Sequence, residues 1–335
     1  MKICFVLNDV ENERDGTSVM MMSSAHARGH EVFAMSVGDF NFHHDEPISI
    51  NSTRLPEDFK TDSAEEFLEA LKGPDAKKQT ISSSILDVLF IRNNPTEEES
   101  SRAWAEHSGI AFGKMMQQQG VLVLNDAFTL SHAFIDKLYF EELPQEIKPD
   151  SLITRNKDDI LDFWKKHNKK MVLKPLEGSG GQNVFLIHEN EKNLNQIIET
   201  IQQDGYIIAQ EYLPDVKNGD VRILLMNGRV MAKDGKQAII RRVSGDGEFR
   251  SNFALGATAD SSDLTPEMQR IVDLTAPKLI SDGLFFVGLD VVKDKLIEIN
   301  VLSPGGMEHF DEIGLPDFTH SIVEAIERKV EYKSL

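Results

Sequence analysis

The chain has 335 residues, 40% hydrophobic and 27% charged, a balance typical of globular proteins. Its 55 acidic residues against 36 Lys and Arg give a net charge of −19, which argues against nucleic acids and anionic membranes as partners. One cysteine, Cys4, excludes an internal disulfide and a cysteine-based zinc site. The sequence has no long apolar segment and no signal-peptide pattern at its start, so we expect a cytoplasmic protein.

The first 124 residues predict a parallel α/β domain. An apolar strand at 2–7, a helix closed by Gly29 and a second strand form a β-α-β unit, and such units build parallel sheets. Residues 41–83 are polar and weakly patterned. The elements expected in this domain are strands at 2–7, 31–37, 85–92 and 121–124 and helices at 17–28, 64–71 and 97–119.

The remaining chain is expected to divide into residues 125–205 and residues 206–335, with mainly antiparallel strands in the second part. The expected helices lie at 158–167, 194–203, 266–282 and 318–329. The expected strands lie at 170–174, 183–188, 207–212, 220–226, 229–233, 237–243, 285–292 and 296–301.

A glycine-rich segment follows the strand that ends at Lys174. It includes Gly178, Ser179, Gly180 and Gly181. Glycines let backbone N–H groups approach phosphate oxygens closely, and the lysine adds a positive charge. No helix begins directly after the glycines, so the segment is neither a P-loop nor a dinucleotide fingerprint. A flexible hairpin turn is the alternative interpretation.

Three oxygen-bearing side chains predict a cation site. Glu298 and Asn300 are two residues apart on one strand and therefore share a face. With a three-residue loop at 293–295, Asp290 on the preceding strand lies opposite Glu298. Such hard oxygen ligands suit Mg²⁺. The alternative is a half-exposed polar sheet face, but two opposed carboxylates repel each other unless a cation lies between them.

Cations and a strand end complete the candidate nucleotide site. Lys137, Arg222, Arg242 and Arg250 could hold phosphate or carboxylate groups, although any one of them alone is more often a surface residue. Arg242 and Arg250 flank a small polar loop at 244–248. The strand end Gln210, Glu211, Tyr212 and Leu213 can offer its backbone to an adenine edge, and Asp220 can bind ribose hydroxyls. An ordinary strand end is the alternative.

Other catalytic classes lack their motifs. The sequence contains no Gly-x-Ser-x-Gly segment, so it supports no serine hydrolase triad. The first turn, residues 8–12, lacks the glycines that a dehydrogenase of the dinucleotide-binding type requires.

Taken in order, these segments resemble the bacterial glutathione synthetases of the ATP-grasp superfamily. The matching segments are Leu152-Ile153-Thr154-Arg155-Asn156, Leu173-Lys174-Pro175-Leu176-Glu177-Gly178, Asp220-Val221-Arg222, Arg250-Ser251-Asn252, Phe286-Val287-Gly288-Leu289-Asp290 and Ile297-Glu298-Ile299-Asn300-Val301 with Ser303-Pro304. The resemblance implies an N-terminal parallel α/β substrate domain (1–124) followed by a two-lobed ATP-grasp fold (125–205 and 206–335, the latter with the metal site).

The resemblance also implies a role for each matching residue. Lys137, Lys174, Gly178, Ser179, Gly180, Gly181, Gln210, Glu211, Tyr212, Leu213 and Asp220 would bind ATP. Arg222, Arg242 and Asn252 would meet an acyl phosphate, and Asp290, Glu298 and Asn300 would bind two Mg²⁺ ions, which Mn²⁺ could replace. Arg92, Arg250, Ser303, Gly305 and Gly306 would contact the substrate.

Two segments depart from the enterobacterial pattern. Arg92 is followed by Asn93-Asn94-Pro95 in place of a basic-acidic pair and two prolines. Ser303-Pro304 is followed by Gly305-Gly306-Met307-Glu308-His309 instead of the usual continuation. Both segments are expected near the peptide substrate, so the acyl donor and the amine acceptor stay open.

The leading hypothesis is therefore a ligase that makes glutathione from γ-glutamylcysteine and glycine, with ATP consumed and an acyl phosphate formed. The alternatives are an ATP-grasp ligase for another amino acid or peptide and a non-catalytic nucleotide-binding protein. The family resemblance further implies small-molecule substrates and a homo-oligomer.

Overall fold

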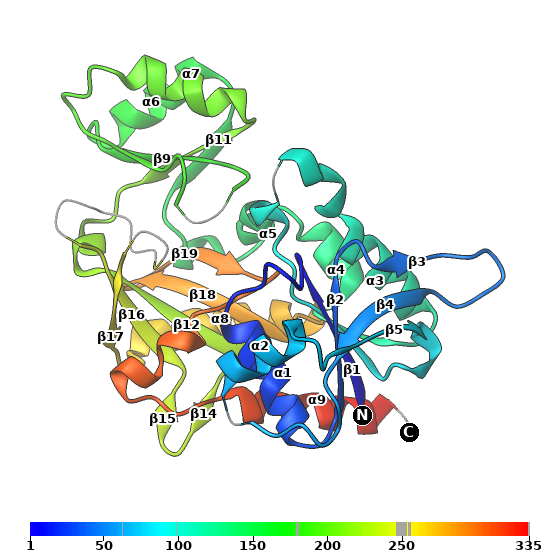
Figure 1. Ribbon diagram of the computed structural model, residues 1–335. Coiled ribbons are helices and arrows are strands. Elements are labelled where there is room, and N and C mark those ends of the chain that lie inside the picture. Colours follow the sequence, from blue (N-terminus) through cyan, green and yellow to red (C-terminus); the bar gives the residue numbers. More distant parts are fainter. Residues whose placement is uncertain (62, 99, 179–180, 246–252, 254–255, 334–335) are drawn as a thin grey trace.

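The computed structural model describes residues 1–335 except 62, 99, 179–180, 246–252, 254–255 and 334–335 (Figure 1). Three sheets dominate it: an N-terminal mixed sheet, a small antiparallel sheet and a larger antiparallel sheet. None of the helices in these described ranges combines the length and the apolar character that crossing a membrane requires.

The N-terminal sheet has the strand order β3-β4-β2-β1-β6-β7, with β5 added to β4. Its strands are β1 (Lys2–Leu7), β2 (Glu31–Ser36), β3 (Phe40–Asn41), β4 (Ser49–Arg54), β5 (Lys77–Ser82), β6 (Val88–Ile91) and β7 (Leu122–Leu124). β1 pairs in parallel with β2 and β6, and β6 pairs in parallel with β7. The predicted parallel core of this domain is confirmed.

Helices cover both faces of this sheet, and every residue of β1 from Ile3 to Leu7 is therefore buried. Ile3, Phe5 and Leu7 pack on the side of α1 (Thr17–Ala27) and α2 (Ala64–Lys72). Cys4 and Val6 pack on the side of α3 (Ser108–Gln118) and α4 (Ala127–His132). Strands buried on both faces read as continuous apolar runs, which is why the sequence marked β1 clearly.

The small sheet has the order β10-β9-β11-β8 and is entirely antiparallel. Its elements are β8 (Ser151–Thr154), α6 (Lys157–Lys166), β9 (Met171–Pro175), β10 (Phe185–Ile187), α7 (Leu194–Gln203) and β11 (Ile207–Glu211). Buried residues of both helices, among them Phe163 and Ile198, pack on Leu173 and Ala209. This core is separate from the cores of the other two sheets.

The larger sheet has the order β17-β16-β12-β18-β19, with β13 added to β12. Its elements are β12 (Asp220–Met226), β13 (Arg229–Val230), β16 (Ile239–Val243), β17 (Thr258–Ser261), β18 (Phe286–Val292) and β19 (Lys295–Asn300), with a separate hairpin of β14 (Ala232–Lys233) and β15 (Lys236–Gln237). α8 (Pro266–Ser281) contributes buried residues to its core, and α5 (Asp136–Glu141) contacts β19.

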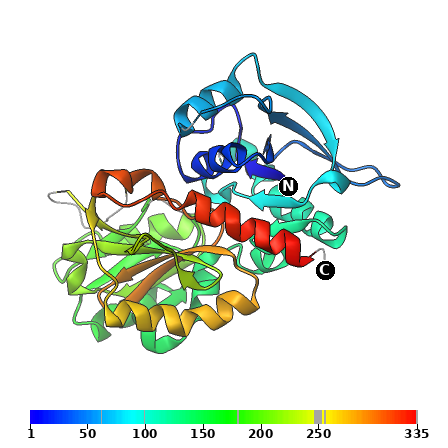
Figure 2. The same ribbon diagram turned by 90° about the horizontal axis from the view of Figure 1, so that it is seen from below.

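Asn125 and the final helix are among the contacts that join the N-terminal domain to the rest of the described chain. The buried Asn125 amide donates Nδ2 to the carbonyls of Phe286 and Val301 and accepts from Phe286 N through Oδ1. The final helix, α9 (Thr319–Lys333), runs back beside α1 (Figure 2), where Arg28 forms an ion pair with Glu327 at 2.8 Å. The chain end therefore packs against the chain start.

The expected boundary between the second and third parts of the chain needs correction. The expected boundary at 205/206 cuts the small sheet, because β11 pairs with both β8 and β9 and turns Ile207 and Ala209 into its core. Residues 97–119 were expected to be mostly helical, and this is confirmed for the described residues, with a 3-10 helix at Ser100–Ala105 and α3 at Ser108–Gln118. The buried Glu98 carboxylate is bound to Asn8 and Arg102, which ties this segment to the end of β1.

The polar stretch 41–83 contains strands that the sequence did not show. β4 and β5 pair over six residues, yet their cross-strand partners are mostly polar, and the apolar pair Ile50 and Ile81 is the exception. Half-exposed strands need few apolar positions, so their periodicity is faint.

Candidate active site

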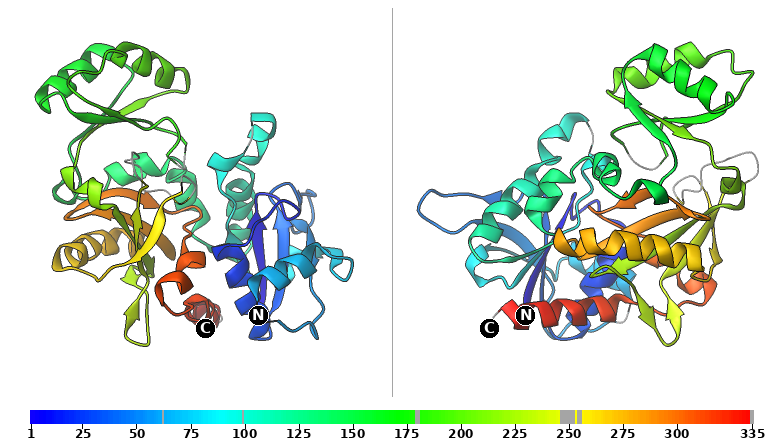
Figure 3. Two further views of the ribbon diagram at one scale, coloured as in Figure 1. Left: turned by 60° about the vertical axis from the view of Figure 1, so that its left-hand side comes forward. Right: turned by 180° about the vertical axis from the view of Figure 1, so that it is seen from behind.

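A cavity of about 430 Å³ lies between the small sheet and the larger sheet, a size typical of sites for small ligands. The small lobe, which consists of the small sheet with α6 and α7, lies over β18 and β19 (Figure 3, left). Most of the expected site residues line this one cavity. Those lining it from the small-lobe side and the connection to β12 are Lys137, Lys174, Gly178, Gly181, Gln210, Glu211, Tyr212, Leu213 and Asp220, and the others are Arg222, Arg242, Glu298, Asn300, Ser303, Gly305 and Gly306.

Two lysines approach the cavity from the small-lobe side. Lys174 on β9 donates Nζ to Gln210 Oε1 at 3.3 Å, and burial lowers the pKa of this lysine although Glu298 opposes the change. Lys137 on α5 donates to the carbonyls of Pro175 and Gly178, at 3.2 and 2.7 Å. Lys137 thereby links α5 to the start of the glycine-rich segment.

An apolar slot accompanies these lysines. Val172, Val184, Leu213, Val216, Val292 and Ile297 line the cavity from both sheets. Val172 shares a face of β9 with Lys174 and lies across from Gln210 on β11. This apolar slot lies beside the end of β11 and suits a heteroaromatic ring, which can pack on the apolar side chains and hydrogen-bond to the backbone.

Four charged side chains form a buried network on the larger sheet. Arg242 donates to both oxygens of Asp220, its cross-strand partner on β12, at 2.7 Å each. Arg222 likewise donates to both oxygens of Asp290, its cross-strand partner on β18, at 2.8 Å each. Arg242 Nη2 also lies 2.8 Å from Asp290 Oδ2. Two positive charges therefore balance two negative ones.

Burial and ion pairing act against each other in this network. Burial would raise the pKa of Asp290, but Arg222 and Arg242 outweigh it and hold that pKa well below its usual range. For Asp220 burial prevails over Arg242, and its pKa rises to about 6. Breaking one pair in such a network leaves an uncompensated buried charge.

The β18–β19 hairpin differs from the expected one. Val292 pairs with Lys295, so the loop has two residues, and Lys293 has a φ of 56°. The register shifts after Asp290, where β19 carries one extra residue. This bulge restores the predicted pairing of Asp290 with Glu298, which is confirmed, and it brings Ile297 into the cavity beside Glu298. Neighbouring residues of a regular strand point to opposite faces, so without the bulge Ile297 would face away from Glu298.

Glu298 and Asn300 therefore line the cavity, whereas Asp290 lies beneath it. Both Asp290 oxygens are bound by guanidinium groups, and Asn300 Nδ2 donates to Asp290 Oδ2 at 3.3 Å. Within the described ranges no three His, Cys, Asp or Glu side chains converge as a metal cluster would. Of the three predicted metal ligands, Glu298 and Asn300 line the cavity.

Arg92 does not line the cavity, although it was expected to contact substrate. It is 4% exposed, and its guanidinium donates to Ser18 Oγ at 3.0 Å and to the Pro304 carbonyl at 2.8 Å. The aromatic rings of Phe90 and Phe286 lie within 5.7 Å of its guanidinium carbon. Segment 303–306 covers this end of β6, so Arg92 supports the cavity wall from behind.

Comparison with known proteins agrees with this architecture. Residues 1–130 match the family model described as "Prokaryotic glutathione synthetase, N-terminal domain", and residues 136–314 match "Prokaryotic glutathione synthetase, ATP-grasp domain". A protein of Vibrio parahaemolyticus named glutathione synthetase is 32% identical to this chain. The match covers 98% of this chain and 99% of the Vibrio protein. The chain belongs to the prokaryotic glutathione synthetase family.

Solved structures share the fold at lower identity. The macrocyclase MdnC of Microcystis aeruginosa, bound with its precursor peptide MdnA, has a TM-score of 0.62 at 15% identity, covering 98% of this chain and 100% of its own. The ATP-grasp ligase PsnB, complexed with a minimal precursor, Mg and ADP, has a TM-score of 0.59 at 14% identity, with 98% of both chains covered. The family and the fold together identify the protein as an ADP-forming ligase that joins a carboxylate to an amine.

Several expected members of the family site lie outside the described residues. They are Ser179 and Gly180 of the glycine-rich segment, Asn252, Arg250 and most of the loop at 244–249. Their roles stay predictions.

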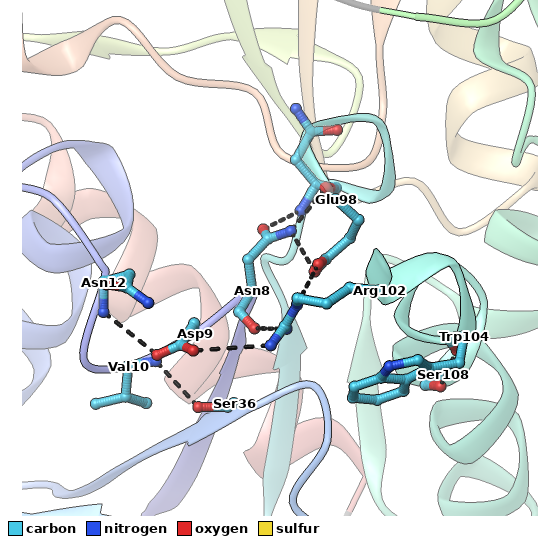
Figure 4. A network of polar contacts seen from close by, with 10 residues as sticks. Asn8, Asp9, Val10, Asn12, Ser36, Glu98, Arg102, Trp104 and Ser108 are labelled. Carbon is cyan, nitrogen blue, oxygen red and sulfur yellow. Dashed lines mark hydrogen bonds and ion pairs between the residues drawn. The ribbon is translucent and has the colours of Figure 1, made fainter. Parts of the chain in front are cut away.

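Sequence reasoning missed Asn94, which lines the cavity from the N-terminal domain. The Asn8 side chain binds its backbone twice, accepting from Asn94 N at 2.7 Å and donating to Asn94 O at 2.8 Å. Asn8 also donates to Glu98, which is bound by Arg102 at 2.7 Å (Figure 4). The departure at Asn93-Asn94 from the enterobacterial pattern was the signal for this residue.

Asp136, next to Lys137, is half-buried and lies outside the lining of this cavity. Burial, and then the charge of Glu298, raises its pKa to about 7, while Lys137 opposes the rise. Nothing in the sequence marked this carboxyl, because its burial depends on how α5 packs.

We expect Arg92→Ala to lower the free energy of unfolding by about 2–4 kcal/mol, because hydrogen bonds from a charged group contribute roughly 1.5–3 kcal/mol and a cavity is left. Urea-induced unfolding measures this. The exposed Arg229→Ala is the matched control, with a change of about 0.5 kcal/mol or less. Equal stability of both variants would show that the contacts of Arg92 with Ser18 and Pro304 contribute little.

Proposed function

We propose that this protein is a glutathione synthetase that uses ATP and Mg²⁺ to join γ-glutamylcysteine to glycine. The observation that carries the proposal is the cavity itself. It gathers Lys137, Lys174, Arg222 and the Glu298–Asn300 pair around one hollow beside an apolar slot. The chain has a net charge of −19, but the cavity lining has as many Lys and Arg as Asp and Glu side chains, so it repels an anionic ligand such as a triphosphate less than the rest of the surface does.

The apolar slot would take the adenine ring, with Gln210 to Leu213 offering the strand end and Asp220 lying near the ribose. Lys174 and Lys137 would face the phosphates. Lys174 is half-buried, so water screens its charge less than at the open surface and it interacts more strongly with a phosphate nearby. The glycine-rich segment would cover the triphosphate from the other side.

The chemistry requires screening of charge rather than a nucleophilic side chain. A carboxylate oxygen of the donor attacks the γ-phosphorus of ATP, ADP leaves, and an acyl phosphate forms. The amine then attacks the acyl carbon and inorganic phosphate departs. Both steps move negative charge among oxygens, which Arg222 and Lys174 would stabilise from fixed positions. Arg242 would support Arg222 through their shared partner Asp290.

The donor set in the cavity suits magnesium. Glu298 and Asn300 offer hard oxygens, and Asp290 lies opposite Glu298 as a third donor if Arg222 turns toward phosphate. When bound, Mg²⁺ would neutralise phosphate charge and hold the triphosphate in place. We propose two such ions, with Mn²⁺ as a substitute, and the similar ligase PsnB was solved with Mg and ADP.

The test is ADP release measured with a panel of acyl donors and amines, with each product identified by its mass. We expect γ-glutamylcysteine with glycine to give the highest kcat/KM and a product with the mass of glutathione. Omitting either substrate is the control. A higher kcat/KM with another donor would support the ligase activity but show that the physiological product is not glutathione. A protein that binds ATP but turns over no donor would be the non-catalytic alternative.

We also propose a cytoplasmic homo-oligomer that takes small-molecule substrates. Burial raises the pKa of the single cysteine, Cys4, so it stays a thiol and adds no disulfide. Light scattering on the purified protein tests the oligomeric state.

A further inference from the structure

Glu308 is a carboxylate of the cavity that has no role in the proposed binding or reaction of ATP. Its Oε2 accepts hydrogen bonds from Thr17 Oγ1 at 2.8 Å and from Gly306 N at 3.1 Å. The residue is exposed and lines the cavity, and its Oε1 has no hydrogen-bond partner among the described residues. Two hydrogen bonds therefore hold a negative charge in place at the cavity wall.

The other acids of the cavity already have partners or a proposed role. Asp220 is bound by Arg242, and Glu211 accepts from Asp150 N. Glu298 belongs to the proposed metal site. A carboxylate with no role toward ATP would repel the triphosphate, so its presence calls for a cationic group on another substrate.

A purely structural role explains less of the geometry. Thr17 Oγ1 already holds this turn by accepting from Met307 N at 3.2 Å, and Arg92 holds it at Pro304. Gly306 has a φ of 111°, a conformation that glycine supplies without help from Glu308. The turn is therefore fixed independently, and Glu308 adds a charge to it.

The position of Glu308 fits one end of an extended donor. Arg222 Nη1 lies 3.3 Å from the Gly305 carbonyl, so the backbone of Gly305 and Gly306 separates Arg222 from Glu308. Arg222 belongs to the proposed reacting end, whereas Glu308 lies against Thr17 of the N-terminal domain. γ-Glutamylcysteine has its reacting carboxylate at one end and an α-ammonium group at the other.

We propose that Glu308 binds the α-ammonium group of the γ-glutamyl residue and so determines which acyl donor is accepted. The inference rests on the proposed function. It assigns a role to a segment, Gly305 to His309, in which this chain departs from the enterobacterial pattern.

The test compares γ-glutamylcysteine with glutarylcysteine, which lacks only the amino group, at saturating ATP, Mg²⁺ and glycine. A hydrogen bond to a charged group corresponds to roughly ten- to hundredfold in binding. We expect the wild-type protein to prefer γ-glutamylcysteine in kcat/KM by about that factor. Glu308→Gln should raise the KM for γ-glutamylcysteine correspondingly and leave the KM values for glutarylcysteine and ATP within about twofold.

Glutamine keeps an oxygen that accepts from Thr17 and Gly306, so Glu308→Gln preserves the turn while removing the charge. Circular dichroism and thermal unfolding verify its fold. The matched control is Asp311→Asn, an exposed acid on the following turn that is absent from the cavity wall, and it should keep the wild-type preference.

Equal losses with both donors would overturn the inference, because they would show that Glu308 only shapes the turn. A wild-type protein without preference between the donors would overturn it too. If γ-glutamylcysteine is not a substrate, the proposed function fails, and the panel donor that is used decides the inference. The inference is supported if that donor carries an ammonium group and Glu308→Gln abolishes its recognition. It is contradicted if the donor carries no ammonium group.

Discussion

Glu298→Gln is expected to reduce kcat at least about a hundredfold while leaving the fold intact. The substitution removes one negative charge and almost no volume, and Glu298 lines the cavity opposite Asp290. Removing one group that stabilises charge in a transition state typically costs a hundredfold or more. Steady-state ADP release over a range of Mg²⁺ concentrations measures the effect.

The control for Glu298→Gln distinguishes metal binding from general electrostatics. A weakened metal site should show a raised Mg²⁺ requirement, and the KM for γ-glutamylcysteine should change little. Glu331→Gln, an exposed acid on α9 far along the chain, should retain wild-type kinetics. Near-wild-type kcat for Glu298→Gln at saturating Mg²⁺ would remove Glu298 from the proposed metal site.

The sequence could predict those parts of the site that depend on neighbours along the chain. Lys174 stands directly before the glycine-rich segment, and one short hairpin places Asp290 opposite Glu298. Both arrangements follow from strand periodicity over a few residues. The bulge at Ile297 was not predictable in the same way, because its two-residue loop and its extra residue compensate each other and leave the Asp290 register unchanged.

The sequence could not predict contacts between distant segments. Arg92 ends a buried strand, as expected, but its partner Pro304 lies 212 residues further on. An isolated sheet edge would leave the guanidinium free for substrate, whereas segment 303–306 covers it in the folded chain. The same reasoning applies to β11, whose sequence fits either neighbouring sheet and whose place is decided by pairing with β8 and β9.

The buried network leads to the second large effect. Asp290→Asn should lower the free energy of unfolding by about 3–5 kcal/mol, the usual cost of removing one partner from a buried ion pair. The variant would leave Arg222 and Arg242 with Asp220 as the one remaining carboxylate of the network. Urea-induced unfolding at about pH 8 measures this, because Asp220, with a pKa of about 6, is then ionised.

The sign of the pH dependence follows from the lowered pKa of Asp290. The stability that this carboxylate contributes is present above its unfolded pKa, about 3.9, and is lost only as the pH falls through the lower folded value. The deficit of Asp290→Asn should therefore persist throughout the neutral range. Asp294→Asn, in the exposed β18–β19 loop, should change stability by about 0.5 kcal/mol or less.

A double variant tests whether charge balance causes the deficit. Adding Arg222→Met to Asp290→Asn removes one positive charge as well and leaves the pair of Arg242 and Asp220, whose two hydrogen bonds of 2.7 Å are untouched. Methionine keeps an apolar stem in place of the guanidinium, so packing is largely retained. We expect the double variant to be at least about 1 kcal/mol more stable than the sum of the single changes predicts. Simple additivity would contradict the balanced network, because each residue would then contribute to stability independently of the charge on the other.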